Sequence, residues 1–292
     1  MRKDMLVYLI FYHSLMYRVV PASLEQKFHS TIEKVKNNVH PPVKLGDFYF
    51  LMLYADVTAI QIEYNEIIRN DSHYSPQSLC DSPLLWRLFY VFQNILRTEG
   101  PYEIENVQIS NGDIVIDAGA NLGVFSLLAM KQGAERVYAF EPNPRICDQF
   151  LHAQIKLNHG QNVIFPIPCG LGAEEEQVTF VDSAVNSGAS HIASIDDIAS
   201  SNDEIITVHI TTVDAFVYEN NIPHVDFIKA DIEGAERFML EGARNTIKRF
   251  HPHLAICIYH FPDDKEVLTK IIQDIDPSYN IICSSTKLYA WV

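Results

Sequence analysis

The chain has 292 residues, of which 48% are hydrophobic and 20% charged, a balance typical of a globular protein rather than a disordered one. Its net charge of −15 argues against a nucleic-acid partner, because proteins that bind a phosphate backbone need a basic face. The five cysteines are widely spaced and form no C-x-x-C pair, which excludes a disulfide framework and a zinc ribbon. This cysteine usage favours a reducing, cytoplasmic location.

The first hundred residues are predicted to be mostly helical. Ser23 and Gln26 form a capping box before a helical apolar repeat, and Ser-Pro at residues 82–83 begins a further helix. The apolar run Met5–Tyr12 is too short to span a bilayer, so no membrane span is expected. We expect residues 1–100 to form a separate region that supplies a lid, substrate contacts or the contact of a possible homodimer.

Strand-like apolar runs alternate with helical patterns in the remainder of the chain, residues 101–292. The runs are Asp113–Asp117, Val137–Phe140, Val163–Pro168, Val225–Ala230 and Leu254–Tyr259, and the helical patterns are Leu122–Gln132, Asn143–Asn158, Ala235–Lys248 and Asp263–Ile275. Near-continuous apolar strands joined by helices indicate a parallel sheet that is covered on both faces. Residues 172–212 add two strand-like pieces (177–181 and 205–211), and residues 279–292 end the chain in a predicted hairpin.

The stretch DIVIDAGANLGVFSLLA predicts a buried strand, a glycine turn and an amphipathic helix. Ligands of such sheets bind beyond the carboxyl ends of the strands. The turn Gly119–Gly123 does not have the G-x-G-x-x-G spacing of a dinucleotide site, and Asp117 at its mouth would repel a pyrophosphate. The turn is therefore predicted to bind a ligand without phosphate groups.

The second strand ends in VYAFEPNP, in which Glu141 follows Asp117 at the offset of an acid that binds ribose hydroxyls. Pro142 stops the strand, and Asn143 can cap the next helix. The alternative interpretation is a helix cap that follows a surface glutamate. A ligand with a ribose, a positive charge and no phosphate would fit an acidic site of this kind, and S-adenosylmethionine has all three properties.

These segments resemble a known family. VIDAGANLG and FEPNP resemble motifs I and II of class I methyltransferases, and TTVDAFVYENNIPHVDFIKADIEGAERFMLEGA with HPHLAICIYHFPDD makes residues 112–264 similar to the FkbM family of S-adenosylmethionine-dependent methyltransferases. The resemblance implies an α/β, Rossmann-like sheet of seven strands with the last one antiparallel. It also implies cofactor contacts along the first two strand ends and near a later turn, namely Asp117, Gly119, Ala120, Asn121, Gly123, Glu141, Pro142, Asn143, Cys169, Gly170 and Leu171.

Charged side chains crowd the end of the fourth strand in FIKADIEGAE, which contains Lys229, Asp231, Glu233 and Glu236. If the fourth and fifth strands are neighbours, Asp231 and His260 lie side by side at the mouth of the site. Methyl transfer to an alcohol requires a general base, and His260 has the intrinsic pKa for that role. Asp231 would orient this imidazole, act as the base itself or bind the substrate hydroxyl. The catalytic candidates are therefore Asp231, His260, Glu233 and Lys229.

Other roles for these residues stay open. Glu236 could complement a helix dipole, His260 could cap the helix that begins near Asp263, and Lys229 could pair with a neighbouring carboxylate. Asp231 and Glu233 with a nearby histidine could hold a divalent cation, but a D-x-E pattern is weak evidence, and no metal site is predicted.

The segment after the fourth strand contains neither an N/D-P-P-Y/F motif nor a Pro-Cys nucleophile, and the acids and histidine predicted there favour oxygen as the methyl acceptor. The expected function is O-methylation of a small-molecule or glycan substrate, and the resemblance suggests a hydroxyl of a sugar, glycan or polyketide-like metabolite. Two alternatives are an NAD(P)-dependent oxidoreductase and a non-catalytic cofactor-binding module. The first lacks the third glycine of its fingerprint and a Tyr-x-x-x-Lys pair.

Overall fold

The computed structural model describes residues 43–45, 48–50, 102–182, 191–192 and 204–292. The chain divides into two units, Met1–Ile95 and Leu96–Val292. In the first unit, β1 (Val43–Leu45) and β2 (Phe48–Phe50) form an antiparallel hairpin. The helices predicted within residues 1–100 lie outside the described part of the chain.

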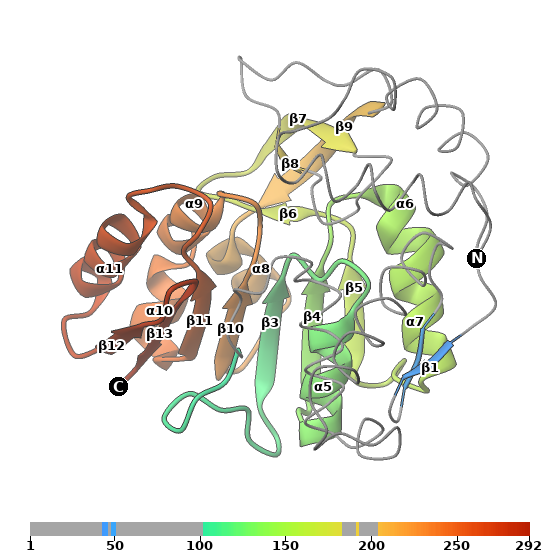
Figure 1. Cartoon of the computed structure of the whole chain (residues 1–292), viewed down its shortest axis with the longest axis horizontal. Coiled ribbons are helices and arrows are strands. Elements are labelled where there is room, and N and C mark those ends of the chain that lie inside the picture. The colour runs from blue at the N-terminus through green and yellow to red at the C-terminus, as the bar shows by residue number, and fades with distance from the viewer. Residues whose placement is uncertain (1–42, 46–47, 51–101, 183–190, 193–203) are drawn as a thin grey trace, which may run out of the picture. The chain divides into compact units, whose positions relative to one another are not determined.

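The second unit contains a seven-stranded sheet with the strand order β12-β13-β11-β10-β3-β4-β5 (Figure 1). Its strands are β3 (Ile114–Ala118), β4 (Arg136–Phe140), β5 (Ile164–Ile167), β10 (Phe227–Ala230), β11 (His253–Cys257), β12 (Asn280–Cys283) and β13 (Lys287–Trp291). Strands β3, β4, β5, β10 and β11 run parallel, whereas β13 is antiparallel to both β11 and β12. This topology confirms the predicted sheet and its antiparallel last strand.

Helices cover the two faces of the sheet. Ile114, Ile116 and Ala118 of β3 share one buried core with α8 (Val213–Glu219), α9 (Glu236–Glu241), α10 (Arg244–Phe250) and α11 (Asp264–Ile275). Successive side chains of a strand point to opposite faces, so Asp117 points away from this core. It contacts Ser126 of α5 (Val124–Gln132), which therefore lies on the other face.

Two predicted helices differ in the structure. The pattern Ala235–Lys248 forms α9 and α10 with a break at Gly242, where a side chain has no room because a β carbon would lie 2.0 Å from the carbonyl oxygen of Gly172. The Gly242 carbonyl also accepts a hydrogen bond from the Asp214 N–H at 2.9 Å, which fixes the break. The second pattern, Asn143–Asn158, contains α6 (Pro144–Ile146), a π-helical segment (Cys147–Leu151) and α7 (His152–Leu157).

The segment between β5 and β10 adds a second sheet, with the strand order β6-β9-β7-β8. Its strands are β6 (Gly170–Leu171), β7 (Glu176–Asp182), β8 (His191–Ile192) and β9 (Glu204–Thr211), and Figure 1 shows them at the top of the view, above the ends of the strands of the main sheet. Strands β7 and β9 confirm the two strand-like pieces predicted there. Among the helices of the described ranges, none has the length and apolar character to cross a membrane.

Candidate active site

The glycine turn after β3 adopts a left-handed backbone at three positions. The φ angles are +74° at Gly119, +47° at Asn121 and +77° at Gly123. The N–H groups of Gly119 and Ala120 both donate to the carbonyl oxygen of Phe140, at 3.1 and 2.9 Å. Glycine is favoured at the first and last of these positions because a β carbon strains this conformation. The turn is thereby tied to the end of β4.

Glu141 is buried and lies against this turn. Its two carboxylate oxygens accept from the N–H groups of Asn121 and Asn143, each at 2.9 Å. Burial raises the pKa of Glu141 to about 7, although the two N–H donors act in the opposite direction. The side-chain oxygen of Asn143 caps α6, as predicted, by accepting from the N–H groups of Arg145 and Ile146.

Two buried amide atoms beside Glu141 have no hydrogen-bond partner among the described residues. They are Oδ1 of Asn121 and Nδ2 of Asn143. Buried polar atoms of native proteins are nearly always satisfied, so an acceptor and a donor left free beside a carboxylate indicate a polar ligand. The three side chains together match a ligand that carries adjacent hydroxyl groups.

Cys169, Gly170 and Leu171 follow β5 and are all buried. A β carbon on Gly170 would lie 3.6 Å from the side chain of Pro142, which places this turn against the Glu141 end of the site. Burial raises the pKa of the Cys169 thiol to about 11. These residues supply apolar surface and main-chain groups next to Glu141.

Asp117 and Lys229 form a buried ion pair between the two central strands. The Lys229 ammonium lies 3.0 Å from Oδ1 of Asp117, whose Oδ2 accepts from the Ser126 hydroxyl at 2.6 Å. Lys229 also donates to the carbonyl oxygens of Ala118 and Gly119, at 3.1 and 2.7 Å. Burial acts to lower the pKa of Lys229, but the Asp117 carboxylate outweighs it and the pKa is raised. Lys229 thus holds the end of β3 in place.

Asp231 follows β10 and lies against the glycine turn. A β carbon on Gly119 would lie 2.0 Å from the carbonyl oxygen of Asp231, so the two strand ends are in direct contact. The Asp231 carboxylate accepts from the hydroxyls of Tyr102 and Tyr259, at 2.7 and 2.9 Å. Burial acts to raise its pKa, but the charge of Lys229 outweighs it, and the pKa is lowered. Asp231 is therefore ionised and firmly oriented.

His260 lies next to Asp231 because β10 and β11 are parallel neighbours. Its Nε2 is 3.8 Å from Oδ1 of Asp231 and 3.4 Å from Oε2 of Glu233, and its Nδ1 is 3.2 Å from Oε1 of Glu236. Burial acts to lower the pKa of His260, but Glu233 and Glu236 outweigh it and raise the pKa to about 11. In this arrangement the imidazole is protonated at neutral pH, which favours Asp231 over His260 as the group that accepts a proton.

The alternative roles of these residues are partly decided by the contacts. At the start of α11, the Asp264 carboxylate accepts from the N–H of Phe261 at 2.7 Å, and the His260 ring faces Glu233 and Glu236 instead of capping that helix. Glu236 lies in the first turn of α9, and it also accepts from the N–H of Ile232 at 2.8 Å. It therefore belongs to the same cluster as His260.

Three side chains of the site were not anticipated from the sequence. Ser126 and Tyr102 contact Asp117 and Asp231, respectively, and Tyr259 contacts Asp231 as well. Tyr259 is adjacent to His260 at the end of the same predicted strand, so the sequence could have indicated that it lies near the site. Tyr102 is 129 residues away from Asp231 along the chain, and no local pattern links the two.

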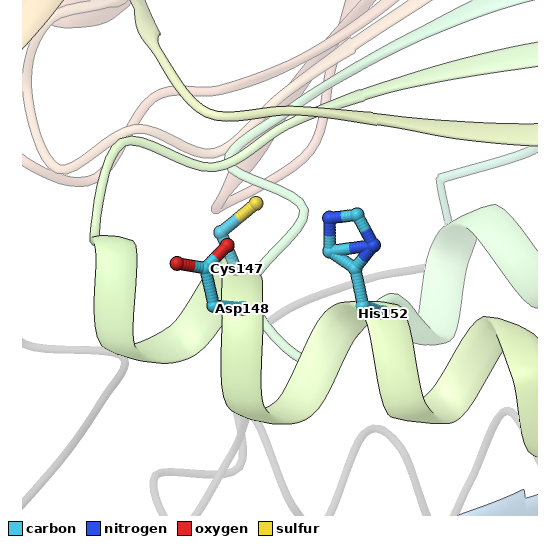
Figure 2. A group of neighbouring side chains, drawn as sticks. All are labelled: Cys147, Asp148 and His152. Carbon is cyan, nitrogen blue, oxygen red and sulfur yellow. The ribbon is translucent and has the colours of Figure 1, made fainter.

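A second cluster of potential ligands, Cys147, Asp148 and His152, lies along the helical segment that follows Asn143 (Figure 2). The Cys147 side chain is buried, whereas Asp148 and His152 are exposed. Burial raises the pKa of the Cys147 thiol to about 12, which favours the neutral thiol. The cluster contains none of the predicted site residues.

Comparison with known proteins gives consistent matches. Residues 117–280 match the family described as Methyltransferase FkbM domain. Hexuronic acid methyltransferase AglP from Haloferax volcanii is 24% identical over 169 residues, which cover 58% of this chain and 65% of that protein. Methyltransferase sdnD from Sordaria araneosa is 25% identical, with coverage of 52% of this chain and 68% of that protein.

The fold also matches a crystal structure of a methyltransferase FkbM from Methylobacillus flagellatus KT. The TM-score is 0.50 at 23% identity, over 81% of this chain and 59% of that chain. The chain therefore spans less than two thirds of the Haloferax relative and of this crystal structure.

Proposed function

Because this chain belongs to the FkbM methyltransferase family, we propose that it is an S-adenosylmethionine-dependent O-methyltransferase that acts on a hydroxyl of a sugar, glycan or polyketide-like metabolite. The observation that carries the proposal is that the Gly119–Gly123 turn contacts both ends of the site. Glu141, with free amide atoms beside it, accepts from the N–H of Asn121 in this turn, and the ionised Asp231, oriented by two tyrosines, lies against Gly119. The proposed cofactor site and the proposed proton acceptor therefore lie next to each other at the ends of the parallel strands.

The cofactor contacts follow from the hydrogen-bonding capacity of this end of the site. Glu141 would accept from ribose hydroxyls, while Oδ1 of Asn121 and Nδ2 of Asn143 offer one acceptor and one donor beside it. The glycine turn would allow close approach of the methionine end, and the Cys169–Leu171 turn would cover the base. When bound, S-adenosylmethionine supplies a sulfonium methyl group that an oxygen nucleophile can take.

The acceptor end is proposed to work through Asp231. Its carboxylate would hold the acceptor hydroxyl and take its proton as the oxygen forms its new bond to carbon. Tyr102 and Tyr259 fix the orientation of this carboxylate, and positioning of this kind supplies much of the rate enhancement of a displacement reaction. Lys229 and His260 keep the carboxylate ionised, because both place positive charge close to it.

The surroundings of Asp231 favour a neutral acceptor with an apolar face. Tyr259 and Phe261 flank His260 and are 40% and 46% exposed, so their rings are available to pack against a sugar ring. Asp231 and Glu233 would repel an acceptor that carries its own carboxylate. We therefore expect a neutral sugar or metabolite hydroxyl to be methylated in preference to an anionic one.

Calorimetric titration and a transfer assay together test this proposal. S-adenosylhomocysteine should bind and NADH should not, and Glu141→Ala should weaken cofactor binding by about 1–3 kcal/mol. Asp231→Asn should lower turnover by about 100-fold or more while the cofactor Kd stays unchanged. Asp148→Asn changes an exposed acid outside the site and serves as the matched control. Binding of NADH instead, or full turnover in Asp231→Asn, would contradict the proposal.

A further inference from the structure

Asp231, Glu236 and His260 bring three potential metal ligands to one point. Each offers one ligand atom, and these atoms all lie within 4.8 Å of one another. The residues come from the loop after β10, the first turn of α9 and the loop after β11. The ends of the adjacent parallel strands β10 and β11 thus place His260 beside two carboxylates from an earlier segment of the chain.

The cluster contains buried polar atoms that the protein itself leaves unsatisfied. Glu236 is 1% exposed and the side chain of His260 is 8% exposed. Oε2 of Glu236 has no hydrogen-bond partner among the described residues, and the ring nitrogens of His260 contact the carboxylates of Glu233 and Glu236, at 3.4 and 3.2 Å, without favourable hydrogen-bond geometry. Such atoms are costly to bury without a partner, so their presence points to a group that binds between them.

The side chains of the proposed ligands are also oriented by hydrogen bonds from neighbouring groups, as those of metal ligands usually are. The Asp231 carboxylate is fixed by the hydroxyls of Tyr102 and Tyr259, and Glu236 is fixed by the N–H of Ile232 at 2.8 Å. This support leaves Oε2 of Glu236 available. The ligands therefore need little rearrangement to bind an ion.

The charge of the cluster fits a divalent cation. Three carboxylates, those of Asp231, Glu233 and Glu236, lie within 3.8 Å of the single imidazole of His260. A cation that binds His260 releases the proton of this imidazolium to solvent, and the divalent ion then offsets two of these charges where the imidazolium offset one. Two carboxylates with one imidazole form a mixed oxygen and nitrogen set, which suits Mn²⁺ better than the all-oxygen shell that Mg²⁺ prefers.

We propose that Asp231, Glu236 and His260 bind a divalent cation of the Mn²⁺ type, and that the acceptor hydroxyl completes its coordination. The second part rests on the proposed function, whereas binding of the ion does not. Three protein ligands leave coordination positions open for a substrate oxygen, and a bound cation lowers the pKa of a hydroxyl that it coordinates. The hydroxyl proton then passes to a carboxylate of the cluster, and no other reactant is required.

Electron paramagnetic resonance of Mn²⁺ tests ion binding on the full chain without substrate. The protein is first freed of metal with a chelator. When it is then added to a Mn²⁺ solution, the signal of the free ion should decrease, and the bound Mn²⁺ should show coupling to an imidazole nitrogen. Glu236→Gln and His260→Gln should weaken binding by about tenfold or more. His152→Ala, in the other ligand cluster, should leave both the affinity and the nitrogen coupling unchanged.

Three outcomes would overturn the assignment. These are no Mn²⁺ binding at millimolar concentrations, binding that is lost in His152→Ala, and binding that persists in both cluster variants. If Glu236→Gln and His260→Gln fail to fold, Asp231→Asn decides, because it removes one carboxylate of the cluster with little change in side-chain size and should also weaken Mn²⁺ binding. Mn²⁺ bound at this cluster without methyl transfer to any hydroxyl would count against the proposed function and leave the ion site standing.

Discussion

At the scale of single residues, Glu141 combines burial with a role as a hydrogen-bond acceptor. Its pKa is raised from 4.5 to about 7 by burial. Because the folded-state pKa is raised, the contribution of Glu141 to stability is complete below pH 4.5 and is lost as the pH rises through about 7. A bound ribose would act in the opposite sense, because its hydroxyls donate to the ionised carboxylate.

The dissociation constant of S-adenosylhomocysteine should therefore depend on pH. Below pH 7 the ligand must displace a proton from Glu141, so the Kd should increase by up to about tenfold for each unit that the pH falls. Calorimetry in two buffers of different ionisation enthalpy should detect the released proton. Glu141→Gln should bind more weakly and lose the pH dependence, and an unchanged slope in that variant would assign the effect to another group.

The two tyrosines on Asp231 give a second test at this scale. Tyr102→Phe and Tyr259→Phe each remove one hydroxyl that donates to the carboxylate and keep the ring. Hydrogen bonds to a charged group contribute about 1.5–3 kcal/mol, so each variant should lower turnover about tenfold or more. Cofactor binding should be unchanged. Tyr218→Phe, at a tyrosine that is 84% exposed, is the matched control, and equal rates in all three variants would contradict the role of the tyrosines.

At the scale of elements, the ion pair of Asp117 and Lys229 joins β3 to β10, which carry the cofactor end and the catalytic end of the site. Both side chains are at most 4% exposed. A buried charge without its partner is costly, whereas a pair that is replaced as a unit often is not. The two halves of the site therefore depend on one buried contact.

Lys229→Met should lower the free energy of unfolding by about 3–5 kcal/mol, because it leaves the Asp117 carboxylate buried without its counter-charge. Adding Asp117→Asn should recover part of this loss. Urea unfolding followed by circular dichroism measures both effects. Lys270→Met, at a lysine that is 75% exposed, should change stability by less than about 1 kcal/mol. A double variant no more stable than Lys229→Met alone would show that the charge is not the cause.

At the scale of the whole molecule, the Leu96–Val292 unit contains every predicted site residue. We therefore expect a protein of residues 96–292 to fold by itself and to bind S-adenosylhomocysteine with the Kd of the full chain. At 100 times the Kd, the ligand should stabilise both proteins by about 2.7 kcal/mol, measured as matched shifts in Tm. Loss of binding in the shorter protein would show that residues 1–95 complete the cofactor site.

The sequence alone determined the features that depend on neighbours in the chain. The strand, glycine turn and helix around Gly119 follow from apolar runs and from a left-handed turn that favours glycine. The cap formed by Asn143 is equally local. Parallel neighbours align their carboxyl ends, so even the meeting of Asp231 with His260 followed from the predicted strand order.

Tertiary structure decided how the charges are distributed and where an element is interrupted. Lys229 is bound to the end of β3, and the proton on His260 is held by carboxylates from the loop after β10 and from the first turn of α9. Tyr102 reaches Asp231 across 129 residues, and the break at Gly242 lies against Gly172, where the Gly242 carbonyl accepts from the N–H of Asp214. A pKa and a close approach depend on all atoms within a few ångströms, and most of those atoms come from distant parts of the chain that no local pattern specifies.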